Sequence, residues 1–206
     1  MSTARRYATY LLATAVAWGA FPPAPARASD EPDSPIPGKV VSITPGKVKV
    51  IGKAFITPII FDLPDPANDP TVEGGELAVF DKDGAGGFDV YPLPPTGWKA
   101  LSPPGSGRYR YRGAGTVADP CRTILIKETI VKAICKGDGV TVTPPFSGSV
   151  AFVLRVGTDT KRYCADFGGT FVRNDPGALR RLDASAPAFC ATTTTISPTS
   201  TTSTIP

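Results

Sequence analysis

Residues 121–135 have the sequence CRTILIKETIVKAIC, in which two apolar, β-branched runs flank a short polar turn. Runs of this composition around a turn predict the two arms of a β-hairpin. Antiparallel arms bring their far ends together, so Cys121 and Cys135 are expected to form a disulfide, and Cys164 and Cys190 a second one. Four cysteines allow three pairings in principle. A nucleophilic or metal-binding cysteine is the rival interpretation, but the spacings are not those of a zinc site.

The rest of the sequence up to residue 190 consists of similar short runs separated by Pro, Gly and Asp. No segment carries a long apolar stripe at helical spacing. The pattern predicts an all-β domain, an antiparallel β-sandwich, with a β-barrel or jelly roll as the alternative. Besides the hairpin, the expected strands are residues 40–43, 47–51, 54–61, 76–80, 88–91, 108–112, 140–143, 149–156 and 162–167.

The N-terminus has the organisation of a cleavable signal peptide over residues 1–28. Arg5 and Arg6 precede an apolar stretch, and Ala26 and Ala28 supply the small residues of a cleavage site before Ser29. The stretch is shorter than the roughly 20 apolar residues of a spanning helix, and no later segment approaches that length. We expect export to the cell envelope or the extracellular space, with no transmembrane segment after cleavage. An uncleaved N-terminal anchor is the alternative.

Three segments are expected to follow the signal peptide. Residues 29–37 are polar and proline-containing and should form a flexible lead. Residues 38–190 should form the β-domain. Residues 191–206 include eleven Thr or Ser residues, and a tract of this kind lacks the apolar surface needed for folding. It predicts a disordered stalk.

The net charge and the absence of histidine exclude several classes of function. The signal peptide holds three of the 22 basic residues and no acid, which leaves 19 basic against 18 acidic residues. A near-neutral domain offers no electrostatic case for a nucleic-acid partner. The chain has no histidine, which excludes Ser-His-Asp and Cys-His catalysis and histidine-ligated metals. We expect no enzyme, and the catalytic alternative that remains open is glycan cleavage by two carboxylates.

An acidic, glycine-rich stretch partly matches a calcium-binding loop. Asp81, Asp83 and Asp89 fall at positions 1, 3 and 9 of such a loop, and Gly86 falls at position 6. Pro92 replaces the bidentate glutamate that position 12 requires. The stretch therefore favours a hairpin loop, with calcium at the three aspartates as the alternative, and no other cofactor is expected.

Four aromatic residues are candidates for ligand binding. Tyr109 and Tyr111 alternate with arginines and so share one face of a strand. Tyr91 and Trp98 would extend this pair into a platform on which a saccharide or a base could stack. The competing interpretation is that the rings pack into the core while the arginines face water.

The order of several short motifs resembles a group of uncharacterised secreted bacterial proteins. The motifs are Gly97-Trp98-Lys99, Asp119-Pro120-Cys121, Cys135-Lys136-Gly137, Arg162-Tyr163-Cys164 with Phe167-Gly168-Gly169, and Ala186-Pro187-Ala188-Phe189-Cys190. The resemblance implies export, disulfides and a single β-domain, and it supplies no activity. We therefore expect a non-catalytic binding or structural module whose partner is a glycan or a surface protein. A carbohydrate-binding module and a glycan-cleaving enzyme are the alternatives.

Overall fold

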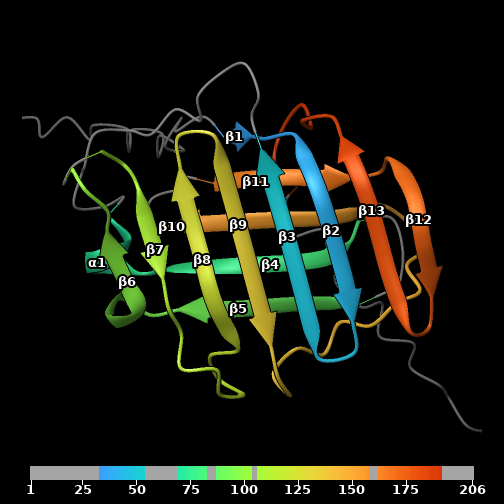
Figure 1. Cartoon of the computed structure of the whole chain (residues 1–206), viewed down its shortest axis with the longest axis horizontal. Helices are drawn as coiled ribbons and strands as arrows, with labels where there is room; N and C mark the ends of the chain where they lie inside the picture. The colour runs from blue at the N-terminus through green and yellow to red at the C-terminus, as the bar shows by residue number, and fades with distance from the viewer. Residues whose placement is uncertain (1–32, 54–68, 83–86, 104–105, 158–161, 192–206) are drawn as a thin grey trace, which may run out of the picture. The chain divides into compact units, whose positions relative to one another are not determined.

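The computed structural model describes residues 33–53, 69–82, 87–103, 106–157 and 162–191, all of which belong to one compact unit. They form two β-sheets packed face to face, and the strands of one sheet run across those of the other (Figure 1). The predicted sandwich is confirmed, and so are the disulfides Cys121–Cys135 and Cys164–Cys190. Two disulfides indicate an oxidising compartment. The expected signal peptide, stalk and strand at 54–61 lie outside the described residues.

The eight-stranded sheet is antiparallel throughout, and the predicted hairpin lies within it. Within it, β3 (Lys47–Lys53) pairs with β9 (Ile130–Lys136), and Val50 lies opposite Ala133. Some 80 residues separate these two strands in the chain. In spatial order its strands are β12 (Thr170–Asp175), β13 (Ala178–Ala184), β2 (Gly38–Thr44), β3 (Lys47–Lys53), β9 (Ile130–Lys136), β8 (Cys121–Lys127), β7 (Tyr109–Tyr111) and β6 (Trp98–Ala100).

The five-stranded sheet lies behind the first in Figure 1 and is antiparallel except for the parallel pair of β1 and β11. Its strands are, in spatial order, β1 (Ser34–Pro35), β11 (Arg162–Phe167), β10 (Val150–Val156), β4 (Gly75–Asp81) and β5 (Phe88–Leu93). A single helical turn, α1 (Pro70–Glu73), precedes β4, and a 3₁₀ turn, η2 (Pro95–Gly97), follows β5. Among the described residues, no helix has the length and apolar character to cross a membrane.

The core lies between the two sheets and follows from the alternation of side chains along each strand. From the eight-stranded sheet it contains Val41, Ile43, Val48, Val50, Ile124, Ile126, Val131 and Ala133. From the five-stranded sheet it contains Leu77, Val79, Leu93, Val150, Phe152, Leu154, Ala165 and Phe167. Nearly all of these side chains are fully buried. The other face of the five-stranded sheet carries a second, smaller buried cluster, which consists of Ala78, Phe80, Ala151, Val153, Cys164 and Cys190.

Two expectations about local structure are wrong. Residues 140–143 are not a strand, because the N–H groups of Thr141 and Val142 donate to the Asp89 carboxylate instead of to a neighbouring strand. The flexible lead expected at 29–37 does not extend through Asp33–Pro37, since Ser34 and Pro35 pair with β11. The sequence interpretation also missed β12 and β13, whose charged residues hide the alternation.

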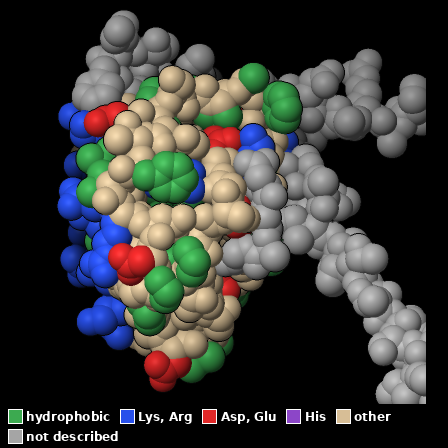
Figure 2. Space-filling view, turned by 90° about the vertical axis from the view of Figure 1, so that its right-hand side faces the viewer, with side chains coloured by type: hydrophobic (Ala, Val, Ile, Leu, Met, Phe, Trp, Pro, Cys, Tyr) green, Lys and Arg blue, Asp and Glu red, His purple; other side chains and the backbone are tan. Residues whose placement is uncertain are grey.

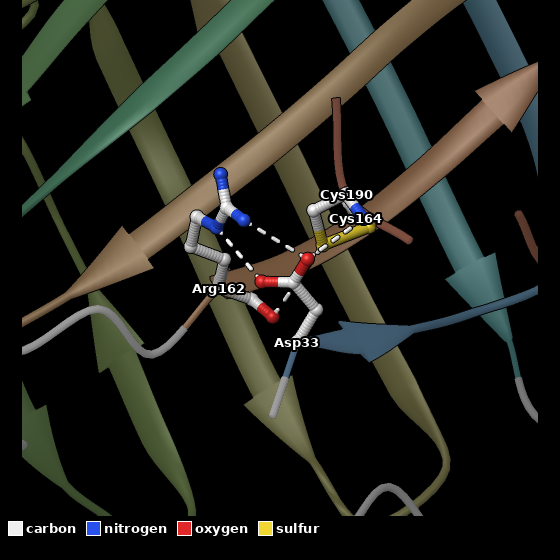
Figure 3. A network of polar contacts seen from close by, with 4 residues as sticks. All are labelled: Asp33, Arg162, Cys164 and Cys190. Atoms are coloured by element: carbon white, nitrogen blue, oxygen red, sulfur yellow. Dashed lines mark hydrogen bonds and ion pairs between the residues drawn. A yellow bond between two sulfur atoms is a disulfide. The ribbon is translucent and has the colours of Figure 1, made fainter. Parts of the chain in front are cut away.

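One polar network fastens both ends of the domain to the five-stranded sheet (Figure 3). The Asp33 carboxylate accepts hydrogen bonds from Nε and Nη2 of Arg162 at 2.8 and 2.9 Å. The same carboxylate accepts the backbone N–H of Cys190 at 2.9 Å. Cys190 is in turn bonded to Cys164 on β11. The first and last parts of the domain are therefore joined on the sheet that lies behind the eight-stranded one.

Candidate anion-binding face

The structure corrects the prediction of an exposed aromatic platform. Tyr91, Trp98, Tyr109 and Tyr111 are 2%, 4%, 8% and 0% exposed. Trp98 and Tyr111 lie opposite each other in the interior, with ring centroids 5.2 Å apart. Rings buried in the core cannot stack on a saccharide or a base, so the interpretation that placed them inside is the correct one.

The buried tyrosines hold their protons more strongly than free tyrosine does. Burial raises the pKa of Tyr91, and so does the hydrogen bond from its hydroxyl to Asp89 at 2.6 Å. Burial and the hydrogen bond to Asp119 at 2.8 Å likewise raise the pKa of Tyr111. Burial also raises the pKa of Tyr109. In all three, the environment favours the neutral phenol over the phenolate.

These shifts predict that the domain loses stability in alkali. Below about pH 10 the folded and unfolded chains both keep the phenol protons, so the tyrosines give no pH dependence there. Above about pH 10 the unfolded chain releases phenol protons that the folded chain retains, so the free energy of unfolding falls as the pH rises, by up to about 1.4 kcal/mol per pH unit for Tyr91. Urea unfolding at pH 9, 10 and 11 measures this slope, and Tyr91→Phe should reduce it. Complete phenolate absorbance in a chain that keeps its β-sheet circular dichroism would contradict the prediction.

Asp89, one of the candidate calcium ligands, accepts hydrogen bonds from several donors of the protein itself. It is 7% exposed. Its carboxylate accepts hydrogen bonds from the Tyr91 hydroxyl at 2.6 Å and from the N–H groups of Thr141 and Val142, each at 2.8 Å. The Thr141 hydroxyl donates to the same carboxylate. Through these hydrogen bonds, Asp89 holds the connection between β9 and β10 against the five-stranded sheet.

Asp81 likewise accepts hydrogen bonds from the connection between β9 and β10, at a point closer to β10. It is 1% exposed and accepts hydrogen bonds from Ser147 N–H and Gly148 N–H, both at 2.9 Å. Arg181 approaches from β13 and donates to the Gly148 carbonyl at 2.5 Å. Asp83 lies outside the described residues, and no group of three metal-ligating side chains occurs among those described. Calcium binding by Asp81, Asp83 and Asp89 remains a prediction that these contacts do not support.

The outer face of the eight-stranded sheet carries a dense set of basic side chains. In Figure 2, Lys and Arg gather along one edge of the view, which is the front of the molecule in Figure 1. We call this surface the cationic face. It is made up of Lys47, Lys49 and Lys53 of β3, Lys132 and Lys136 of β9, Arg122 and Lys127 of β8, Arg110 of β7, Lys99 of β6 and Arg180 of β13.

Strand register explains why these side chains share one face. Along β3, Val48 and Val50 are fully buried, so the lysines that alternate with them point outward. Directly paired residues of an antiparallel sheet lie on the same side. Lys47 pairs with Lys136 and Ile51 with Lys132, so the cations continue from β3 onto β9.

Acidic residues are scarce among the described residues of this surface. β2, β3, β8 and β9 contain no Asp or Glu at all. At its margins, Asp183 pairs with Lys39 at 2.8 Å, and Glu128 lies 3.9 Å from Arg108. Lys47 and Lys136 lie directly opposite each other, and like charges in such a pair repel one another.

A shallow hollow of about 540 Å³ opens on the cationic face over β13, β2 and β3. It is lined by Lys39, Val40, Ser42, Lys47, Lys49, Arg180, Leu182 and Asp183. Val40 and Leu182 are paired across the strands and lie among the basic side chains. The hollow therefore combines a small aliphatic floor with a rim of four basic side chains and one acid, Asp183.

Sequence reasoning missed the cationic face because it weighed net charge alone. The available signal was local: residues 38–53 contain four lysines and no acid, and residues 121–136 contain four basic residues and only Glu128 as an acid. In comparisons with protein-family models, with curated proteins and with solved structures, nothing matches this chain. The chemistry of the cationic face is therefore the basis for assigning a function.

Proposed function

We propose that the protein is an exported, non-catalytic binding module that holds an acidic polysaccharide against its cationic face. The observation that carries this proposal is the gathering of ten basic side chains on one side of a single sheet, four of whose strands have no acid. A surface of this kind attracts polyanions by releasing their counterions.

The form of the face favours a polymer over a small ligand. Neighbouring strands lie about 4.8 Å apart and alternate residues of one strand about 7 Å apart, so the cations form a broad two-dimensional array. Seven of the ten are lysines, which act as mobile point charges and suit repeated, loosely oriented anionic groups.

An acidic glycan fits this face better than a nucleic acid does. Binding of single-stranded nucleic acid relies on aromatic side chains that stack with the bases. The described outer positions of β2, β3, β8 and β9 carry aliphatic side chains such as Ile51, Leu125 and Ile134 between the cations, and no aromatic ring. A glycan needs no stacking platform for charge pairing, and its C–H groups can contact the aliphatic side chains.

The attachment of the first and last parts of the described domain is consistent with this role. Asp33 and Cys190 are fastened to β11 of the five-stranded sheet (Figure 3). These two residues therefore lie on the sheet opposite the one that carries the cationic face. The signal peptide expected at residues 1–28 would bring the domain to the compartment where envelope glycans lie.

Binding of polygalacturonate, neutral dextran and single-stranded oligo-dT by the domain from residue 29 tests the proposal. We expect polygalacturonate to bind with an affinity that falls steeply between 50 and 300 mM salt, oligo-dT to bind at least 10-fold more weakly, and dextran not to bind. Equal binding of dextran and polygalacturonate would contradict the electrostatic basis. Tighter binding of oligo-dT would contradict the assignment to a glycan.

A further inference from the structure

We propose that the hollow over β13, β2 and β3 is a subsite for a single uronate unit of the glycan, so that the cationic face recognises carboxylated sugars and not merely negative charge. This inference rests on the proposed function and adds to it the class of sugar. It follows from how the hollow differs from the rest of the cationic face.

The basic rim is the first difference. Arg180, Ser42 and Lys49 lie in register on three adjacent strands, so a guanidinium and an ammonium flank one hydroxyl. Lys47 lies two residues from Lys49 on the same side of β3. Among the described residues, no acid lies within ion-pair distance of Lys47, Lys49 or Arg180. Asp183 also lines the hollow, but it pairs with Lys39, so three of the four cations there have no acidic partner among the described residues.

The floor is the second difference, and it determines the kind of anion. Val40 and Leu182 are partly exposed and lie directly opposite each other. An inorganic anion has no apolar surface that could contact the aliphatic floor, and a space of about 540 Å³ is far larger than such an ion. A uronate has a carboxylate at one edge of the ring and C–H groups across its face. The carboxylate suits the fork of Arg180, which can donate two parallel hydrogen bonds, while the ring lies on the two aliphatic side chains.

The backbone at the rim is the third difference. Asp183 has φ of 46°, the one positive φ of a non-glycine residue among those described. On the neighbouring strand the register shifts between Gly38 and Val40, which sets Lys39 out of the regular ladder. Such irregularities re-aim side chains and are frequent beside functional sites. Here they place Lys39 at the rim, where Asp183 holds it at 2.8 Å.

Matched charge changes inside and outside the hollow test the inference. Lys49→Gln with Arg180→Gln removes two charges from its rim, and Lys132→Gln with Lys136→Gln removes two charges from β9. The probes are trigalacturonate, its methyl ester, inorganic sulfate and polygalacturonate. All variants are first compared by thermal melting, so that loss of fold is separated from loss of binding.

We expect trigalacturonate to bind the unchanged domain, its methyl ester to bind at least 10-fold more weakly, and sulfate not to compete at equal charge concentration. The hollow variant should lose at least 10-fold in affinity for trigalacturonate, and the β9 variant less than 3-fold, while both lose affinity for polygalacturonate. Equal losses for trigalacturonate, or competition by sulfate, would overturn the subsite and leave binding of the polymer intact. Failure of polygalacturonate itself to bind would overturn the proposed function instead.

Discussion

Reversing two charges at the centre of the cationic face, Lys49→Glu with Lys132→Glu, is expected to lower the affinity for polygalacturonate by more than 100-fold at low salt. A basic side chain near an anionic surface contributes about 1 kcal/mol, and its reversal adds a repulsion of similar size. Two reversals therefore amount to about 4 kcal/mol, and each 1.4 kcal/mol is a factor of ten. Equilibrium binding of the polymer at 50 mM salt measures the change.

The matched control compares single reversals on the two outer faces. Lys132→Glu and Arg155→Glu change the net charge equally, but Arg155 lies on β10, where it pairs with Glu76 at 3.3 Å. We expect Lys132→Glu alone to weaken polymer binding by about 2 kcal/mol, roughly 30-fold. Arg155→Glu should have a small effect. Equal losses would show that binding follows net charge and not the cationic face.

Asp89→Ala is expected to destabilise the domain by about 4 kcal/mol. The substitution removes the acceptor of two backbone N–H groups, from Thr141 and Val142, and of the hydroxyls of Tyr91 and Thr141. A buried donor left without an acceptor costs about 1 to 3 kcal/mol, and some relaxation or entry of water offsets part of the sum. Urea unfolding at pH 7 measures the change in the free energy of unfolding.

Two further variants separate burial from the number of hydrogen bonds. Tyr91→Phe removes only one of the donors to Asp89 and should cost about 1 kcal/mol. Asp175 also accepts two backbone N–H groups, from Gly177 and Ala178, but in an exposed turn. Asp175→Ala should therefore cost far less than Asp89→Ala. A change below 1 kcal/mol for Asp89→Ala would mean that the connection between β9 and β10 does not depend on this carboxylate.

Local periodicity was sufficient to predict the strands whose inward residues are all apolar. Residues 121–135 alternate clearly, and the two cysteines at their ends fix the pairing of the arms, so both the hairpin and its disulfide were predictable. β13 was not, because Arg181 occupies an inward position. Its guanidinium can be buried there because the carbonyls of Phe167 and Gly148 accept its N–H groups, and these partners come from distant parts of the chain.

The cationic face could not be predicted from composition because it depends on which strands are neighbours. The lysines of β3 and of β9 are brought together only by pairing between strands some 80 residues apart. The aromatic candidates failed for a related reason. Tyr109 and Tyr111 do share one face of β7, as the alternation predicted, but only the packing of the two sheets determines that this face is the buried one.

Chemical-shift mapping tests the central claim most directly, because it locates the binding surface residue by residue. An isotope-labelled domain is titrated with polygalacturonate, and the amide shifts are followed in two-dimensional ¹H–¹⁵N spectra. The account predicts that the largest changes cluster on β13, β2, β3, β9 and β8, with the strongest around Ser42 and Lys49, and that those on β4 and β10 stay small. Changes that cluster on the five-stranded sheet, or that spread evenly over both sheets, would contradict it.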